Sequence, residues 1–254
     1  LAKGGITDYR LQKRISPEKT LSSVLYPLFS VILILAYGYF RLSQTIEGKY
    51  IKVATIQGNI PQDMKWNPHI REDILNKYFV LTNRAYNEHP DIIVWPETSM
   101  PGYLEEKTAL WKKVISLSGN ISPAYLLLGA VYQGEEGQVY NSAALMFAGE
   151  VIERYDKLHL VPFGEYIPLK KILPFLETVV PIGDMTPGKE YTVFKLPVTF
   201  SVLICFEDLF PELSREFVRR GANFLVNITN DAWYKKTSAA HQHLQASVFR
   251  AVEN

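Results

Sequence analysis

Three side chains that can do chemistry occupy equivalent positions in the sequence, each just past an apolar segment that predicts a strand. Glu97 follows Ile92-Ile-Val-Trp-Pro, Lys157 follows Val151-Ile-Glu-Arg-Tyr-Asp, and Cys205 follows Ser201-Val-Leu-Ile. In open α/β sheets, ligands bind outside the carboxyl ends of the strands. A carboxylate can accept the thiol proton, an ammonium can stabilise an oxyanion, and a thiolate can attack an acyl carbon. Together, these residues predict nucleophilic acyl chemistry at the edge of a sheet.

Each of these residues also has an ordinary structural interpretation. Cys205 is the single cysteine of the chain, and a cysteine that ends an apolar strand is often inert core. Glu97 after Trp-Pro is consistent with a carboxylate at a helix N-terminus, and Lys157 with a solvated turn. The shared position of the three residues favours the catalytic interpretation.

Composition and charge argue against several other functions. The 254 residues include 27 Lys and Arg against 26 Asp and Glu, a formal net charge of +1, so no charge surplus favours binding to nucleic acid. A single cysteine allows neither an intrachain disulfide nor a cysteine zinc cluster. His241 and His243 lie two positions apart and point to different faces of a helix, so no metal site is predicted. The glycines do not form a phosphate-binding loop, and no cofactor is expected.

The elements that must position the reactive residues can be read from hydrophobic periodicity, and they predict an α/β fold. Strands are expected at 51–57, 91–95, 124–132, 139–147, 151–155, 199–204 and 222–228. Helices are expected from 70 to about 90, at 105–118, at 211–220 and at 239–253. A hairpin turn is expected at Gly149-Glu150.

Residues 166–189 predict no regular element, because the segment contains Pro168, Pro174, Pro181 and Pro187. It is also too apolar for an ordinary solvated loop. We expect it to form a membrane-facing lid that admits lipid to the reactive residues. The alternative is a packed loop that contributes to the core.

An apolar segment precedes the α/β pattern. Residues 20–40 carry no charged side chain, and a helix of this length, at about 1.5 Å per residue, spans roughly 30 Å of hydrocarbon. A buried core helix or a signal peptide is the alternative, but the segment ends in Tyr37, Tyr39 and Phe40 rather than in a small-residue cleavage site. Five basic residues precede it, namely Lys3, Arg10, Lys13, Arg14 and Lys19. The positive-inside rule therefore predicts a cytoplasmic N-terminus and an external C-terminal part.

Several motifs resemble a known family. Ile93-Val-Trp-Pro-Glu97-Thr, Arg154-Tyr-Asp-Lys157-Leu-His-Leu-Val-Pro-Phe-Gly-Glu165-Tyr-Ile-Pro168 and Leu203-Ile-Cys205-Phe-Glu207-Asp resemble the Glu-Lys-Cys triad segments of the nitrilase (carbon–nitrogen hydrolase) superfamily. Gln57-Gly-Asn-Ile-Pro-Gln62-Asp-Met-Lys-Trp66, Phe163-Gly-Glu-Tyr-Ile-Pro168 and Asn230-Asp-Ala-Trp233 resemble one branch of it, the apolipoprotein N-acyltransferases of bacterial membranes.

The resemblance implies a four-layer α-β-β-α sandwich and a role for each matched residue. Cys205 would be the nucleophile, Glu97 the general base and Lys157 the cation that stabilises the oxyanion, with Glu165 and Glu207 as further catalytic carboxylates. The residues expected to bind substrate are Trp66, Asn141, Phe206 and Trp233. The implied reaction moves an acyl chain from a phospholipid, through a thioester, to the N-terminal amine of a diacylglyceryl-cysteine apolipoprotein.

The resemblance also implies a domain layout, with a cytoplasmic loop at 1–20, a transmembrane helix at 21–42 and a nitrilase-like periplasmic domain at 50–254. The implied location is the bacterial inner membrane. We expect the chain to be a fragment, because the family has earlier membrane helices and further C-terminal strands. Two departures are Phe206, where the family commonly has Tyr, and Tyr-Lys-Lys after Trp233, where Phe-Gly is more usual.

Two other functions remain open at this point. One is a nitrilase-type amidase that hydrolyses a small soluble amide, which would need neither the membrane helix nor the apolar segment. The other is a non-catalytic binding domain tethered to the membrane, in which the triad residues are structural. Thiol reactivity separates these, because an activated thiolate reacts near neutral pH, whereas a buried structural cysteine resists alkylation.

Overall fold

Two units make up the chain, Leu1–Glu47 and Gly48–Asn254. The computed structural model describes residues 17–45, 48–65, 67–105, 108–168 and 184–254. The described part of the first unit contains the helix α1 (Pro17–Ser43), and the second unit contains the described strands.

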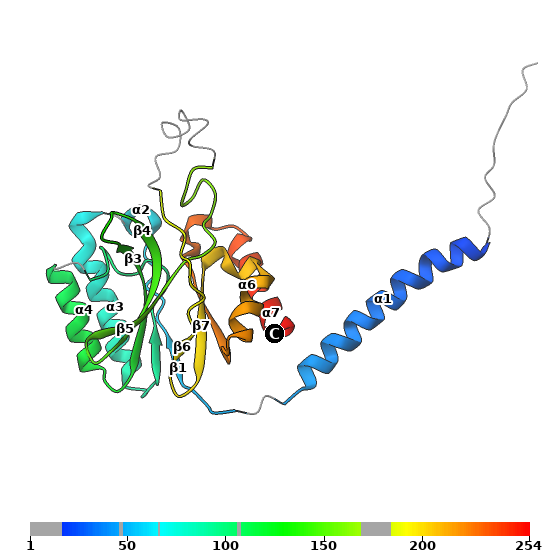
Figure 1. Cartoon of the computed structure of the whole chain (residues 1–254), viewed down its shortest axis with the longest axis horizontal. Coiled ribbons are helices and arrows are strands. Elements are labelled where there is room, and N and C mark those ends of the chain that lie inside the picture. Colours follow the sequence, from blue (N-terminus) through cyan, green and yellow to red (C-terminus); the bar gives the residue numbers. More distant parts are fainter. Residues whose placement is uncertain (1–16, 46–47, 66, 106–107, 169–183) are drawn as a thin grey trace, which may run out of the picture. The chain divides into compact units, whose positions relative to one another are not determined.

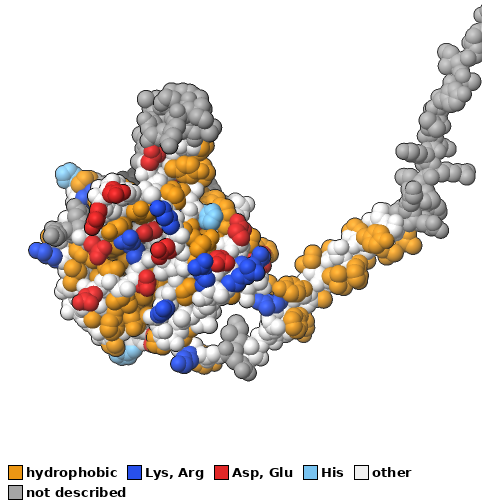
Figure 2. Space-filling view, viewed as in Figure 1, with side chains coloured by type: hydrophobic (Ala, Val, Ile, Leu, Met, Phe, Trp, Pro, Cys, Tyr) orange, Lys and Arg blue, Asp and Glu red, His pale blue; other side chains and the backbone are white. Residues whose placement is uncertain are grey.

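The helix α1 includes the apolar segment seen in the sequence. Its residues Leu21–Ser43, 23 in number, are long and apolar enough to cross a membrane, by length and composition alone. Figure 2 shows hydrophobic side chains along the visible side of this helix. Passage through a membrane and the orientation of the chain stay predictions.

The second unit is built from two facing β-sheets with helices on their outer sides (Figure 1). The five-stranded sheet has the order β1-β2-β3-β4-β5, and the three-stranded sheet has the order β6-β7-β8. The strands are β1 (Val53–Thr55), β2 (Ile92–Val94), β3 (Tyr125–Gln133), β4 (Val139–Phe147), β5 (Glu150–Asp156), β6 (Phe194–Lys195), β7 (Thr199–Ile204) and β8 (Phe224–Ile228). The α-helices are α2 (Gln62–Lys65), α3 (Arg71–Tyr86), α4 (Ala109–Asn120), α6 (Pro211–Arg219) and α7 (Ala239–Glu253). The 3₁₀ helices are η1 (Pro68–Ile70), η2 (Cys205–Leu209) and η3 (Asp231–Tyr234).

Two apolar cores fill the spaces between the layers. Successive residues of a strand point to opposite faces, so Ile93 of β2 packs with the helices α3 and α4, whereas Ile92 and Val94 pack between the sheets. The helix-facing core includes Leu75, Tyr78, Val114 and Leu117. The core between the sheets includes Leu127, Tyr155, Phe200 and Val202, and it extends to Phe217 of α6. The predicted four-layer α-β-β-α sandwich is therefore confirmed.

Strand direction brings the predicted residues to one edge. The strands β1, β2 and β3 are parallel, and β3, β4 and β5 are successively antiparallel, so β5 runs in the direction of β2. The carboxyl ends of β2 and β5 therefore lie at the same edge of the sheet, where Glu97 and Lys157 follow them. In the second sheet, β7 ends at Ile204, directly before Cys205.

A buried carboxylate joins the two sheets. The hydroxyl of Tyr155 in β5 donates a hydrogen bond of 2.8 Å to Oε1 of Glu207 in η2. The same oxygen accepts from the amides of Leu158 and His159 at 2.8 and 3.0 Å, and Oε2 accepts from the amide of Ile204 at 2.8 Å. Glu207 therefore fixes the segment that carries Lys157 against the turn that carries Cys205.

Most predicted elements agree with the structure, and the differences concern short ones. The elements β4, β7 and α7 have the predicted bounds, while β1 and β2 are three residues long and shorter than expected. The two-residue strand β6 was not predicted, because so short a strand has no readable alternation. The strand β7 leads directly into η2, which the sequence pattern did not indicate.

The predicted lid falls largely outside the described residues, because residues 169–183 are not among them. The described flank is fixed to the catalytic region by main-chain hydrogen bonds. The amide of Met185 donates to the carbonyl of Glu165, and the amide of Gly188 donates to the carbonyl of Lys157, both at 2.8 Å. The lid itself stays a prediction.

Candidate active site

Cys205 lies at the sharp turn between β7 and η2. Its φ of +54° is in the left-handed region, which residues other than glycine seldom adopt. Its main-chain carbonyl oxygen lies 3.1 Å from Nε2 of His243 and 3.4 Å from Nδ2 of Asn227. Strained residues of this kind persist only where their surroundings hold them, and they cluster at functional sites.

Glu97 is held by hydrogen bonds from three parts of the chain. Its carboxylate Oε1 accepts from Nδ2 of Asn141 in β4 at 2.8 Å, and Oε2 accepts from the amide of Asn230 at 3.1 Å. Its main-chain carbonyl accepts from Nζ of Lys65 in α2 at 3.0 Å. The next residue, Thr98, has a φ of +44°. The carboxylate is therefore fixed in place, although it lies beyond the regular strand β2.

The ammonium of Lys157 lies between two carboxylates. Its Nζ is 2.9 Å from Oε2 of Glu165 and 3.9 Å from Oε1 of Glu97, and its side chain is 1% exposed. Burial lowers the pKa of Lys157, but the charges of Glu97 and Glu165 outweigh burial, so the pKa is raised. This group therefore keeps its positive charge inside the site.

The thiol of Cys205 is neutral at rest. Burial, followed by the charge of Glu97, raises its pKa to about 12, although Lys157, the side chain of Thr229 and the amide of Phe206 act in the opposite direction. The direction of this shift disfavours a resting thiolate, and the activated thiolate considered from the sequence stays a prediction. A base that removes the proton as the sulfur attacks would suit such a thiol, and Glu97 acts electrostatically on this thiol.

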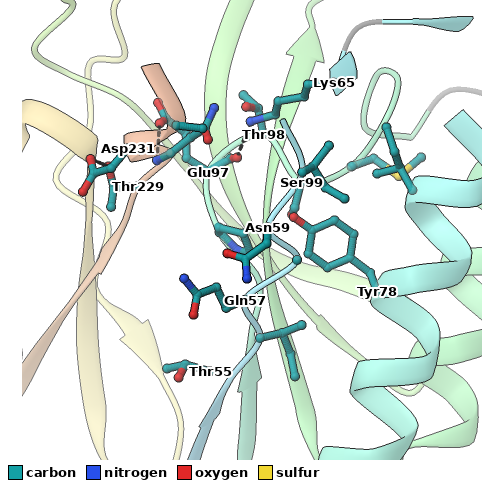
Figure 3. Close-up of a pocket in the computed structure, with 18 of the residues that line it drawn as sticks. Thr55, Gln57, Asn59, Lys65, Tyr78, Glu97, Thr98, Ser99, Thr229 and Asp231 are labelled. Atoms are coloured by element: carbon teal, nitrogen blue, oxygen red, sulfur yellow. Dashed lines mark hydrogen bonds between the residues drawn. The ribbon is translucent and has the colours of Figure 1, made fainter. Parts of the chain in front are cut away.

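A cavity of about 710 Å³ opens beside Glu97 (Figure 3). In the view, Glu97, Thr98 and Lys65 lie close together, and Tyr78 projects from α3 into the same space. The apolar part of the lining includes Ile56, Ile60, Ile74, Met100 and Leu244. Apolar walls with a few converging polar groups suit a ligand that has both an apolar and a polar part.

The predicted catalytic residues fall into two groups. Glu97, Lys157 and Glu165 form one buried cluster, and the charges of Glu97 and Lys157 act on the thiol of Cys205. Glu207 is different, because the hydrogen bonds described for it tie main-chain segments and Tyr155 together. These contacts give Glu207 a positioning role, and its expected catalytic role stays a prediction.

The roles of the predicted substrate-binding residues stay predictions. Trp66 lies outside the described residues. Asn141, Phe206 and Trp233 are not among the described residues that line the cavity. Asn141 instead bridges Glu97 and Glu165 with two hydrogen bonds of 2.8 Å. The ring of Phe206 lies 5.9 Å from that of His243, and Trp233 is 65% exposed.

Sequence reasoning did not identify three residues of this site. Lys65 and Asn230 contact Glu97, and both stand in quoted motifs, beside Trp66 and before Asp231. His243 was considered only as a metal ligand, and it contacts the carbonyl of Cys205. Within the described ranges, no group of three or more His, Cys, Asp or Glu residues is arranged to hold a metal ion.

A two-sheet sandwich with a carboxylate, an ammonium and a thiol beyond three of its strands defines a class of proteins. The sequence matches the carbon–nitrogen hydrolase family over residues 52–254, and the chain belongs to that family.

Within this class, the chain is similar to proteins named apolipoprotein N-acyltransferase. It is 42% identical to the one from Geobacter metallireducens over 242 residues, which is 90% of this chain and 46% of that protein. It is 31% identical to the one from Aquifex aeolicus, over 91% of this chain and 54% of that protein. The chain thus spans about half the length of these relatives.

Solved structures support the fold. An amidase of the nitrilase superfamily from Nesterenkonia aligns with a TM-score of 0.56 and 21% identity, over 81% of this chain and 74% of the amidase. A nitrilase-superfamily protein of Saccharomyces cerevisiae aligns with a TM-score of 0.55 and 21% identity, over 82% of this chain and 73% of that protein. At this level of identity, the likeness concerns the fold alone.

Proposed function

We propose that this chain is the catalytic part of a membrane-bound acyltransferase. It takes an acyl chain from a phospholipid onto Cys205 and passes it to the N-terminal amine of a diacylglyceryl-cysteine apolipoprotein. The observation that carries the proposal is the buried Glu97–Lys157–Glu165 cluster beside the thiol, in a chain similar to proteins of that name. The part-apolar cavity beside Glu97 supports a substrate with an acyl chain.

In the first half-reaction, Glu97 takes the thiol proton and the sulfur of Cys205 attacks the acyl carbonyl carbon. Negative charge develops on the carbonyl oxygen, where the Lys157 ammonium stabilises it. The ester C–O bond then breaks, the protonated Glu97 gives its proton to the leaving alkoxide, and a lysophospholipid departs. The product is a thioester on Cys205.

In the second half-reaction, the α-amine of the lipoprotein attacks the thioester. Glu97 accepts a proton from the amine nitrogen, and the C–S bond breaks as the amide forms. The thiolate of Cys205 then takes the proton from Glu97 and returns to the resting thiol. Glu165 and Asn141 keep the side chains of Lys157 and Glu97 in place in both half-reactions, through hydrogen bonds of 2.8 to 3.0 Å.

We further propose that α1 crosses the bacterial inner membrane and places residues after it on the periplasmic side. Basic residues cluster before the helix, which supports a cytoplasmic N-terminus. A topology reporter inserted after residue 47 should be active only outside the cytoplasm. Cytoplasmic activity of that reporter would refute the orientation and the access to lipoprotein substrates.

The function is tested with the full chain in mixed micelles that contain a phospholipid and a synthetic diacylglyceryl-cysteine peptide. We expect mass spectrometry to show one added acyl chain on the peptide, and none when its α-amine is acetylated beforehand. Hydrolysis of a small amide without acyl transfer would favour a nitrilase-type amidase. No turnover of either substrate would favour a non-catalytic binding domain.

A further inference from the structure

His243 is a buried side chain that the proposed reaction does not use. It projects from α7, 38 residues after the nucleophile in sequence, and its side chain is 6% exposed. Its Nε2 lies 3.1 Å from the carbonyl oxygen of Cys205 and 3.0 Å from Oδ1 of Asp208. Its Nδ1 lies 2.9 Å from Oδ1 of Asp231. The ring therefore connects the nucleophile's main chain with two carboxylates.

The geometry makes this ring a cation. Both ring nitrogens face oxygen atoms of carboxylates or a carbonyl, which accept hydrogen bonds, so both nitrogens must carry a proton. The hydrogen bond to Asp208, together with the weaker effect of the one to Asp231, raises the pKa of His243 to about 9. Asp208 is fully buried, and its other oxygen accepts from Nδ2 of Asn227 at 3.0 Å and from Ser247 at 2.6 Å. The imidazolium thus balances a carboxylate that has no access to water.

The contact with Asp231 links His243 to a loop that reaches Glu97, the proposed general base. The hydroxyl of Thr229 donates to Oδ1 of Asp231 at 2.9 Å, and the same side chain acts to lower the pKa of the Cys205 thiol. Between them, the amide of Asn230 donates to Oε2 of Glu97 at 3.1 Å. The loop 229–231 therefore contacts Glu97 and influences the pKa of the thiol, and His243 holds one end of the loop.

We propose that His243 is a positioning residue for the nucleophile. It fixes the carbonyl of Cys205 and the loop 229–231 together, and so sets the distance and direction between the thiol and Glu97. The strained turn at Cys205 needs such support, because its φ of +54° is unfavourable without surrounding contacts. The acyl-transfer part of this inference rests on the proposed function, whereas its effect on the thiol does not.

The test uses variants that keep one ring contact each. The side-chain amide of Gln can replace Nε2–H, and that of Asn can replace Nδ1–H, so His243→Gln keeps the bond to the Cys205 carbonyl and His243→Asn does not. The first measurement is the rate of iodoacetamide alkylation of Cys205, which needs no lipid substrate. The second is the rate of thioester formation from phospholipid.

We expect His243→Asn to slow thioester formation on the order of tenfold to a hundredfold, because small misplacements of reacting groups have effects of this size. His243→Gln should retain most of the rate of thioester formation. The rate of Cys205 alkylation should also change more in His243→Asn than in His243→Gln. The exposed His241 on the same helix provides the control, because His241→Gln should match the unmodified chain. Asp231→Ala serves as a second variant, because it removes the oxygen that faces Nδ1 of His243, whereas Asn would keep an accepting oxygen there.

The outcomes are distinct. The inference is overturned if both His243 variants keep the alkylation and thioester-formation rates of the unmodified chain while their melting temperatures fall equally. That result would show a purely structural role. Altered alkylation with no acyl transfer in any form would support the positioning role while refuting the proposed function. If His243→Asn does not fold, an unchanged alkylation rate in Asp231→Ala overturns the inference.

Discussion

Gly129 passes so close to Glu97 that a Cβ atom on Gly129 would lie 2.6 Å from the Cα of Glu97. The same atom would lie 2.4 Å from the carbonyl oxygen of Pro96. The carbonyl of Gly129 in turn accepts hydrogen bonds from Ser99 Oγ and the amide of Met100, both at 3.1 Å. The absence of a side chain in the middle of β3 therefore allows the segment with Glu97, the proposed general base, to pack against the sheet.

Gly129→Ala should displace Glu97, because the neighbouring atoms are main chain and cannot rotate away. We expect acyl transfer to fall by about tenfold to a hundredfold and the free energy of unfolding to fall by about 1–3 kcal/mol. Gly119→Ala is the control, since a Cβ there meets nothing within 4 Å and alanine favours the helix α4 by up to about 1 kcal/mol. Unchanged activity in Gly129→Ala would contradict this account of Glu97.

Asn141→Asp tests the bridge between Glu97 and Glu165. The amide of Asn141 donates to both carboxylates at 2.8 Å, and a carboxylate there would face two like charges. Like charges disfavour ionisation, so the acid limb of the pH profile for acyl transfer should move up by about one pH unit. Asn120→Asp, at the exposed end of α4, should leave the profile unchanged. An identical profile in the Asn141 variant would show that the bridge does not set the charge of the base.

Alkylation of Cys205 tests whether the thiol is neutral at rest. Because burial raises its pKa to about 12, the thiolate fraction should grow roughly tenfold per pH unit between pH 7 and 9. The iodoacetamide rate should rise with it and show no plateau. Lys157→Met should react more slowly at each pH, because Lys157 lowers the pKa of this thiol. A plateau below pH 8 would show a resting thiolate instead.

The sequence predicted the layers of the fold better than the contacts inside the site. The largely apolar run of β4, which is buried on both faces, and the helical spacing in α7 were readable because such patterns are local. The convergence of Glu97, Lys157 and Cys205 also followed, since strand ends in such sheets meet at one edge. The strand β6 and the helix η2 were missed because neither leaves a periodic signal.

Contacts between distant residues were not predictable from local pattern. The spacing of His241 and His243 correctly placed them on different faces, one exposed and one buried. It gave no sign that His243 would meet Asp208 and Asp231, because these pairings depend on how α7 packs on η2 and η3. The sequence likewise gave no sign that β4 places Asn141 between two carboxylates, where its amide donates to both.

Lys65 should reduce stability near neutral pH. Burial lowers its pKa from 10.5 to about 8. Between pH 8 and pH 10.5 the unfolded chain therefore binds more protons than the folded chain, and the free energy of unfolding rises with pH. At pH 7, the buried charge is disfavoured. We therefore expect Lys65→Met to be more stable by about 1–2 kcal/mol, after allowing for its lost hydrogen bond to the Glu97 carbonyl.

The advantage of Lys65→Met should shrink between pH 7 and 10, as measured by urea unfolding. Lys77→Met, at an exposed position on α3, is the matched control and should show no such trend. Two results would contradict a buried charge at this position. One is a Lys65→Met variant that is less stable than the unmodified chain at pH 7; the other is a variant stabilised by the same amount at pH 7 and at pH 10.

The role of Cys205 as acyl carrier is tested by the intact mass of the full chain after incubation with phospholipid vesicles and no acceptor. We expect a mass increase equal to one acyl chain, removed by hydroxylamine as expected for a thioester and absent in Cys205→Ala. Since Cys205 is the single cysteine, no other thioester can form in this chain. A hydroxylamine-sensitive acyl increment that persists in Cys205→Ala, or no increment in the unmodified chain, would contradict Cys205 as the acyl carrier.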